Sequence, residues 1–198
     1  MTDWLTRWQR IARRIRVPLG FAAAALYLFE LWRRQPRLAA ILWSLALVVP
    51  GLWLRAYASG YVKKNQELTV TGPYAHVRNP LYLGSIYIAA GFALALGSWA
   101  FAAALAVFFV AIYVPVIASE ERFLRSTFPA FDDYCRHVPR LIPRLTAVRL
   151  GSQADRGRFF FRLYLKHREY NALIGAILLY LSLFILRPVL SLIVRGRP

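Results

Sequence analysis

The sequence predicts an all-α membrane protein, a polytopic bundle of about five transmembrane helices in a single domain over residues 1–198. Of the 198 residues, 59% are hydrophobic, a larger share than soluble domains usually carry. The apolar residues gather in runs close to the roughly 20 residues that a helix needs to cross a bilayer. The formal net charge of +17 comes mostly from arginines that flank these runs, as basic residues do beside membrane spans.

Residues 1–16 are basic and carry Trp4, Trp8 and Ile11 between arginines. This pattern is typical of a short amphipathic helix on the inner membrane surface, and equally of a frayed basic tail. The apolar stretch that follows has no small-residue cleavage site, so we expect the segment to stay on the mature protein.

The first two apolar runs extend over Val17 to Trp32 and Leu38 to Tyr57. The first run is short and contains Glu30, so it either spans the membrane or lies at its interface. Pro50 and Gly51 lie inside the second run and predict a kink there.

The next two runs, Leu81 to Leu96 and Ala100 to Ala118, are separated only by Gly97-Ser98-Trp99. A connection this short predicts a tight helical hairpin over about 81–118. Small residues in both runs, among them Gly84 and Gly91, predict that the two helices of the hairpin pack closely against each other.

The chain beyond the hairpin is polar and basic up to Glu169. We expect one helix over Glu120 to Arg136, ended by the prolines of VPRLIP, because proline disfavours helix in the residue before it. The aromatic run Phe159 to Tyr164 is typical of an interfacial anchor. A last span follows over 170–194.

The distribution of arginine and lysine predicts the orientation in the membrane. The polar segments 59–79 and 120–169 lie on the same side of the hairpin and are both basic, so we place them, with the N-terminus, in the cytoplasm. The basic turn Arg33 to Arg37 then lies outside, against the rule. The positive face is expected to bind anionic lipids, and nucleic acid is not an expected partner because the charges flank spans.

We expect no metal site. Cys135 is the one cysteine, and His76, His137 and His167 do not stand at ligand spacing. These side chains are more typical of an ordinary thiol and of surface contacts.

Hydrogen-bonding side chains concentrate in the segment Gln66 to Gly84, next to the hairpin. The hairpin brings Arg78 near Glu120 and Glu121, and ionisable groups at the edge of a span indicate function unless they are paired. The alternative is an Arg78 to Glu120 ion pair that only joins the two ends of the hairpin. Asn79-Pro80 predicts a helix N-cap and first turn, with backbone donors that either face an anion or are simply capped.

Two separated motifs carry a resemblance to a known family. TGPYAHVRNPLYLG is followed about 35 residues later by SEERFL and then by DDYCRHVPRLIP. Together they resemble the isoprenylcysteine carboxyl methyltransferase family and its relatives among the phospholipid methyltransferases. The resemblance covers a core of residues 66–143 and implies an integral membrane enzyme that uses S-adenosylmethionine.

The resemblance implies a set of cofactor-binding residues. They are Gln66, Glu67, Leu68 and Thr69 through the backbone, Tyr74, Asn79, Pro80, Leu81 and Tyr82 in the first motif, and Glu120 in the second. The chemistry agrees, because aromatic faces stabilise a sulfonium, Glu120 suits an ammonium and Arg78 suits a carboxylate.

The sequence also departs from the family at positions that affect the acceptor. Asn79 stands where eukaryotic members have histidine, and Pro129 stands near a frequent glycine. Val116 stands where the eukaryotic enzymes carry an arginine implicated in binding the substrate's carboxylate. The resemblance therefore supports the donor half of the site better than the acceptor half.

The expected function is S-adenosylmethionine-dependent methyl transfer to a lipophilic acceptor at the cytoplasmic membrane face, with a carboxylate as one acceptor. Phospholipid N-methylation is one alternative, and a noncatalytic membrane protein that binds anionic lipid or a partner is another. Arg78 and Glu121 are the candidate catalytic residues. An amine acceptor must lose a proton, for which Glu121 or His76 is the nearest base.

Overall fold

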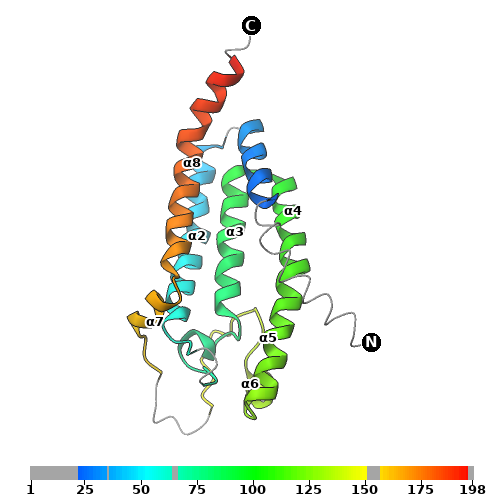
Figure 1. The fold of residues 1–198 in the computed structure, drawn as a ribbon, viewed down its shortest axis with the longest axis vertical. Coiled ribbons are helices and arrows are strands. Elements are labelled where there is room, and N and C mark those ends of the chain that lie inside the picture. The colour runs from blue at the N-terminus through cyan, green and yellow to red at the C-terminus, as the bar shows by residue number, and fades with distance from the viewer. Residues whose placement is uncertain (1–21, 35, 64–66, 151–156, 196–198) are drawn as a thin grey trace.

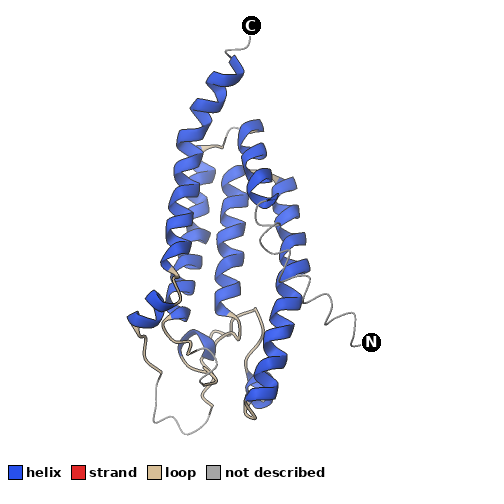
Figure 2. Cartoon of the chain, in the orientation of Figure 1, coloured by secondary structure: helices blue, strands red, loops and turns tan. Residues whose placement is uncertain are grey.

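The computed structural model describes residues 22–34, 36–63, 67–150 and 157–195. Within these ranges the chain is helical and contains no strand, as predicted (Figure 2). Residues 22–33 form a helix that precedes α2. The other elements are α2 (Leu38–Ser59), the 3₁₀ helix η1 (Gly72–Ala75), α3 (Pro80–Leu96), α4 (Trp99–Phe108), the π-helix η2 (Phe109–Tyr113), α5 (Val114–Thr127), α6 (Phe131–His137), α7 (Phe161–Lys166) and α8 (Tyr170–Arg195).

The long helices run alongside one another in an elongated bundle, in the order α8, α2, α3 and α4 across the view of Figure 1. The short helices η1, α6 and α7 gather at one end of the bundle, where α2 and α5 end and α3 and α8 begin. We call this the loop end.

Two described helices are long and apolar enough to cross a membrane. They are Leu38–Ser59, with 22 residues, and the continuous helix Trp99–Thr127, with 29 residues. Pro80–Leu96 and Tyr170–Ile185 are apolar but shorter. Large apolar side chains such as Trp43 and Trp53 of α2 are exposed on the outside of the bundle, as in helices that face lipid. By length, the described residues therefore support two of the roughly five spans that the sequence predicts.

The connection between α3 and α4 is as tight as predicted. Gly97 takes the left-handed conformation, with φ 60°, which is favourable for glycine after a helix. Ser98 then caps α4 by accepting a hydrogen bond from the backbone N–H of Phe101 at 3.1 Å. Arg34, which pairs with Glu30 at 2.8 Å, also donates to the carbonyl of Gly97 at 2.6 Å.

The glycines of α3 pack on α2, whereas the sequence predicted that they pack on the next helix; among the other small residues, Ala95 does share a buried cluster with Phe101 of α4. A Cβ atom at Gly84 would lie 2.7 Å from the carbonyl oxygen of Gly51. A Cβ atom at Gly91 would lie 2.5 Å from Val48 Cγ2. Glycine at these positions lets the two backbones approach, so α2 and α3 form the close pair of the bundle.

The predicted single helix over Glu120 to Arg136 is also wrong. α5 ends at Thr127, and Phe128 is extended, with φ −122° and ψ 109°, because Pro129 follows it. The chain then starts again as α6, whose Phe131 and Tyr134 are buried in a small cluster with Val138. VPRLIP ends α6 as predicted, since Val138 is extended.

Candidate functional site

A cavity of about 370 Å³ lies at the loop end. Its walls come from the end of α2, the segment that leads into α3, the middle of the Trp99–Thr127 helix, α6 and the start of α8. It is lined by Arg55, Val62, Lys63, Glu67, Leu68, Thr69, Tyr74, Arg78, Asn79, Pro80, Leu81, Tyr82, Ser85, Tyr113, Glu120, Glu121, Phe123, Leu124, Phe131, Tyr134 and Glu169.

The structure brings the residues selected from the two motifs to this one cavity. Its lining contains Glu67, Leu68, Thr69, Tyr74, Arg78, Asn79, Pro80, Leu81, Tyr82, Glu120 and Glu121. The remaining selected residue, Gln66, lies outside the described residues. The two motifs, which are separate in sequence, therefore line the same cavity.

The start of α3 differs in one detail from the prediction. Pro80 occupies the first helical turn as predicted, but the side chain of Asn79 does not cap the helix. Its Nδ2 instead donates to the carbonyl of Arg140 at 3.1 Å. The Arg78 backbone N–H makes a parallel contact to the carbonyl of Pro139 at 2.9 Å. The VPRLIP segment thus holds the entry to α3 in place.

The alternative that the sequence left open, an ion pair between Arg78 and Glu120, is not found; Arg78 pairs with Glu121 instead. Arg78 Nη2 lies 3.4 Å from Glu121 Oε1, and Arg140 binds both oxygens of the same carboxylate. The Glu121 side chain is only 8% exposed. With both oxygens held by guanidinium groups, Glu121 is suited to fixing Arg78 and the VPRLIP segment, and poorly suited to accepting a proton from a substrate.

Glu120 is exposed and has a different partner. The Tyr82 hydroxyl donates to Glu120 Oε1 at 2.9 Å. The ring of Tyr82 packs edge to face on Tyr113, with centroids 5.1 Å apart. Tyr113 ends the π-helix η2, and such local widening of a helix often occurs at functional sites. This wall offers one carboxylate beside two aromatic rings, a combination that suits a cationic ligand.

Two buried tyrosines, Tyr74 and Tyr134, also line the cavity, and we call them its floor. The Tyr134 hydroxyl donates to the carbonyl of Tyr74 at 2.7 Å. Burial raises the pKa of Tyr74, and the negative charges of Glu120 and Glu169 raise it further. Burial also raises the pKa of Tyr134, which the charge of Arg78 partly offsets. Both phenols are therefore protonated hydrogen-bonding groups at neutral pH.

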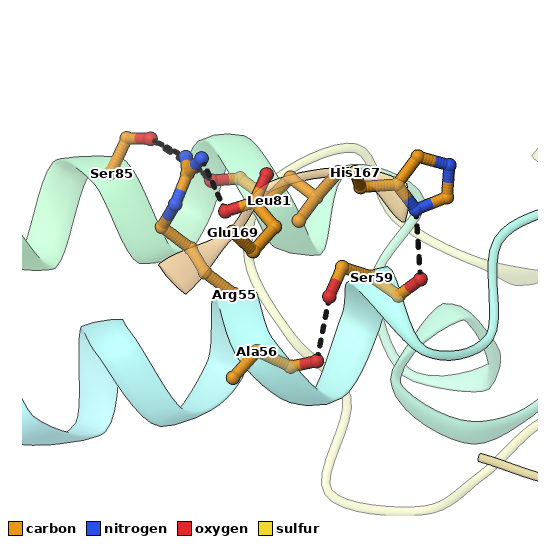
Figure 3. A network of polar contacts seen from close by, with 7 residues as sticks. All are labelled: Arg55, Ala56, Ser59, Leu81, Ser85, His167 and Glu169. Atoms are coloured by element: carbon orange, nitrogen blue, oxygen red, sulfur yellow. Dashed lines mark hydrogen bonds and ion pairs between the residues drawn. The ribbon is translucent and has the colours of Figure 1, made fainter. Parts of the chain in front are cut away.

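Sequence reasoning missed an ion pair in the cavity wall. Arg55 Nη2 binds Glu169 Oε2 at 2.7 Å, and Arg55 Nη1 donates to the carbonyl of Leu81 and to the Ser85 hydroxyl (Figure 3). His167 Nδ1 contacts the carbonyl of Ser59 at 3.1 Å in the same region. The sequence feature that could have predicted this pair is Arg55 itself, a lone arginine inside an apolar run. An ionisable residue within a membrane span usually has a functional role.

Part of the hydrogen-bonding capacity of the cavity wall is not used within the described protein. Thr69 Oγ1, Arg55 Nε and Arg78 Nε are buried without a partner among the described residues. A buried polar atom without a hydrogen-bond partner is energetically costly. In functional sites a ligand often supplies the missing partner. The mixture of carboxylates, guanidinium groups and aromatic rings fits a ligand that carries both charges, such as S-adenosylmethionine.

The histidines make surface contacts to the backbone. His76 Nδ1 contacts the carbonyl of Arg144 at 2.8 Å, and His137 Nδ1 contacts the carbonyl of Asp133 at 2.9 Å. Within the described ranges, no group of three or more His, Cys, Asp or Glu side chains is arranged to hold a metal ion.

Comparison with known proteins connects this geometry to a family. The model of the phospholipid methyltransferase family matches residues 40–130, from the start of α2 to the end of α5 and the turn after it. The matched segment holds the residues of the first motif with Glu120 and Glu121, and it excludes Arg140 and Glu169.

Two curated relatives match about half of the chain. The nickel-cobalt-cadmium resistance protein NccN of Alcaligenes xylosoxydans xylosoxydans is 42% identical over 101 residues, which cover 51% of this chain and 46% of the relative. The cobalt-zinc-cadmium resistance protein CzcN of Cupriavidus metallidurans is 41% identical over 98 residues, or 50% and 44% of the two chains. The chain thus spans about half the length of these relatives, and no solved structure matches it. Over residues 40–130, a little under half of its length, this chain is similar to the phospholipid methyltransferase family, which is grouped with the isoprenylcysteine carboxyl methyltransferases among the membrane methyltransferases.

Proposed function

We propose that this protein binds S-adenosylmethionine in the loop-end cavity and transfers its methyl group to a lipophilic acceptor from the bilayer. The observation that carries the proposal is the convergence of two motifs on one cavity. Tyr82 of the first motif and Glu120 of the second are 38 residues apart in sequence and are joined by a hydrogen bond of 2.9 Å.

The residues present suit the parts of the donor. The faces of Tyr82 and Tyr113 would lie beside the sulfonium, and Glu120 would bind the ammonium. Arg78, oriented by Glu121, would bind the carboxylate. Glu121 acts in this proposal as a positioning residue, because Arg78 and Arg140 already engage its oxygens.

When bound, S-adenosylmethionine supplies an electrophilic methyl carbon. Transfer is a direct displacement in which the bond from carbon to the acceptor forms as the carbon–sulfur bond breaks, so the protein needs no nucleophile of its own. Its contribution is to align the two reactants and to exclude water. The buried floor of Tyr74 and Tyr134 supports both tasks.

We also propose a multi-pass topology of about five spans, with the cavity and the N-terminus on the cytoplasmic side. The basic residues around the loop end support this orientation. NccN and CzcN are named for metal resistance. We propose that a methyltransferase in that setting acts by modifying a membrane component.

Equilibrium binding of S-adenosylmethionine to the detergent-purified protein tests the proposal. The wild type is expected to bind, and Glu120→Ala to weaken binding by about tenfold or more, because a charge-assisted hydrogen bond is lost. Asp132→Asn is the matched control, since Asp132 is exposed on α6 and pairs with Arg125 away from the cavity. No binding by the wild type, or no effect of Glu120→Ala, contradicts the proposal.

Methyl transfer from labelled donor into membrane extracts tests the second step. A base-labile product indicates an ester, and a stable product an amine. A protein that binds the donor but labels no membrane component would instead support the noncatalytic alternative.

A further inference from the structure

The Arg55–Glu169 ion pair lies where charged groups are energetically unfavourable. Arg55 is in the last part of α2, an otherwise apolar helix, and Glu169 immediately precedes α8. Their side chains are only 22% and 12% exposed. Buried ion pairs contribute little net stability, because desolvation offsets most of their attraction. Stability alone therefore does not explain why the pair lines the cavity.

The pair stands across the cavity from the groups assigned to the methyl donor. Glu120 and Tyr113 belong to the Trp99–Thr127 helix on one side of α3, whereas Arg55 belongs to α2 and Glu169 to the turn that leads into α8, both on the other side (Figure 1). Tyr74, Glu120 and Glu169 all line this one cavity. A ligand bound beside Glu169 would face a donor bound beside Glu120.

The hydrogen bonds of the pair leave an acceptor oxygen open. The terminal nitrogens of Arg55 are engaged by Leu81, Ser85 and Glu169. Glu169 uses Oε2 for Arg55, and its Oε1 has no hydrogen-bond partner among the described residues. Arg55 thus fixes the carboxylate, and the free oxygen is available to a group that carries a hydrogen.

On this basis, and resting on the proposed function, we propose that Glu169 is an acceptor-side positioning residue that binds the N–H of a lipophilic amine. The protonated amine first releases one proton to solvent; the neutral amine then donates a remaining N–H to Glu169 and keeps its lone pair on another side, where it can attack the methyl carbon as the carbon–sulfur bond breaks. A carboxylate acceptor would instead meet the like charge of Glu169, which is unfavourable. Glu169 lies outside the matched residues 40–130, so this assignment depends on the geometry of the cavity.

Binding of simple amphiphiles to the wild type tests the inference without requiring turnover. The probes are decylamine, decyltrimethylammonium and decanoate, titrated into nanodiscs that contain the protein, with empty nanodiscs as the blank. The two cations share chain length and charge at pH 7, but only decylamine has N–H groups. We expect decylamine to bind about tenfold tighter than decyltrimethylammonium, and decanoate to bind weakest. Equal affinity for the two cations overturns the inference.

The variant Glu169→Gln assigns the preference to this side chain. Glutamine retains an oxygen that can accept from Arg55, so the contact between α2 and α8 is kept, while its amide nitrogen can no longer accept from an amine. The preference for decylamine is expected to disappear in Glu169→Gln and to remain in the control Asp132→Asn. A preference that survives in Glu169→Gln contradicts the assignment.

Binding of S-adenosylmethionine to the same samples separates this inference from the proposed function. We expect Glu169→Gln to bind the donor within about twofold of the wild type. A parallel loss of donor binding would place Glu169 on the donor side and overturn the acceptor-side assignment. Failure of the wild type to bind the donor would contradict the proposed function itself.

Discussion

At the scale of single residues, Glu120 and Glu121 are adjacent in sequence and opposite in surroundings. Glu120 is exposed and bonds to Tyr82, whereas Glu121 is buried between Arg78 and Arg140. Neighbouring residues of an α-helix point about 100° apart, so one faces the open part of the cavity and the other faces its wall. The first is placed to meet a ligand and the second to hold the wall together.

The substitution Glu121→Ala is therefore expected to destabilise the fold more than to alter one contact. Arg78, only 14% exposed, loses its partner, and breaking a buried pair typically costs about 3 to 5 kcal/mol. Arg140 is about half exposed, so we expect a loss near 3 kcal/mol in the free energy of unfolding, measured by chemical denaturation in detergent. The control Asp132→Ala breaks an exposed pair and should leave the free energy of unfolding nearly unchanged. Equal effects of the two variants would show that Glu121 is not structural.

The residues of the two motifs could be selected from sequence because each motif is local. The residues with which the cavity side chains pair could not be selected in this way. Arg55 and Glu169 are 114 positions apart, and the sequence around each residue does not indicate that the two form a pair. The choice of Glu121 over Glu120 as the partner of Arg78 depends on the absolute rotation of α5. Helical periodicity fixes the 100° between neighbours but not that starting angle, which the preceding π-helix changes.

At the scale of helices, the contact of α2 with α3 depends on glycines at Gly51, Gly84 and Gly91. The backbones meet at the first two of these positions. A Cβ atom at Gly51 would lie 2.8 Å from the carbonyl oxygen of Gly84, and one at Gly84 would lie 2.7 Å from that of Gly51. The cavity opens directly beside this contact, since Arg55 also packs on Gly84. A change in helix separation here would move Arg55 relative to the start of α3.

The substitution Gly84→Ala should separate α2 from α3. Its Cβ would lie 2.6 Å from Arg55 Cγ and 2.7 Å from the oxygen of Gly51. We expect a loss of about 1 to 3 kcal/mol in unfolding free energy, together with weaker donor binding. Gly175→Ala in α8 is the control, because nothing lies within 4 Å of its Cβ position, and it should be neutral or stabilising by up to about 1 kcal/mol. If both variants behave alike, the helix contact is looser than described.

The helix boundaries were predictable where the signal was local. Gly97-Ser98 indicated the hairpin turn, and Pro80 indicated the start of α3. Pro129 was visible too, yet an apolar stripe of Phe123, Leu124, Phe128 and Phe131 favoured one long helix, and the break was missed. The packing of α3 on α2 was missed because small residues indicate a close neighbour without indicating which neighbour.

At the scale of the whole molecule, the cavity draws its walls from segments between Arg55 and Glu169, well beyond the family match at residues 40–130. The all-helical fold followed from composition and apolar run length. The number of membrane spans could not be predicted as directly from composition and run length, because α3 and the described apolar part of α8 are shorter than a full membrane crossing. Helix tilt and neighbouring helices decide such cases, and hydropathy records neither.

The stability of the molecule should fall in alkaline solution. Burial raises the pKa of Tyr74 and of Tyr134, and burial together with the hydrogen bond between Tyr61 and Tyr57 raises the pKa of Tyr61 to about 12. The unfolded chain releases these protons near pH 10, so above that pH it binds fewer protons than the folded protein does. Unfolding is therefore favoured progressively as the pH rises from about 10 to 12 and beyond.

Thermal unfolding between pH 8 and 12, with tyrosinate absorbance recorded in parallel, checks this expectation. Tyr74→Phe keeps the ring and removes one of the ionising groups, so its melting temperature should decline less steeply above pH 10 than that of the wild type. Ionisation of every tyrosine near pH 10 in the folded protein would contradict the assigned burial.

The long sequence distance between Arg55 and Glu169 also matters for biosynthesis. A ribosome delivers Arg55 to the membrane 114 residues before its counter-ion exists. Until then, α2 carries an uncompensated cation, which insertion scales penalise by about 2.5 to 3.5 kcal/mol at a helix centre and less near its end. The chain can neutralise that charge only when the residues before α8 emerge. The cavity can thus be completed only after the chain has been synthesised as far as Glu169.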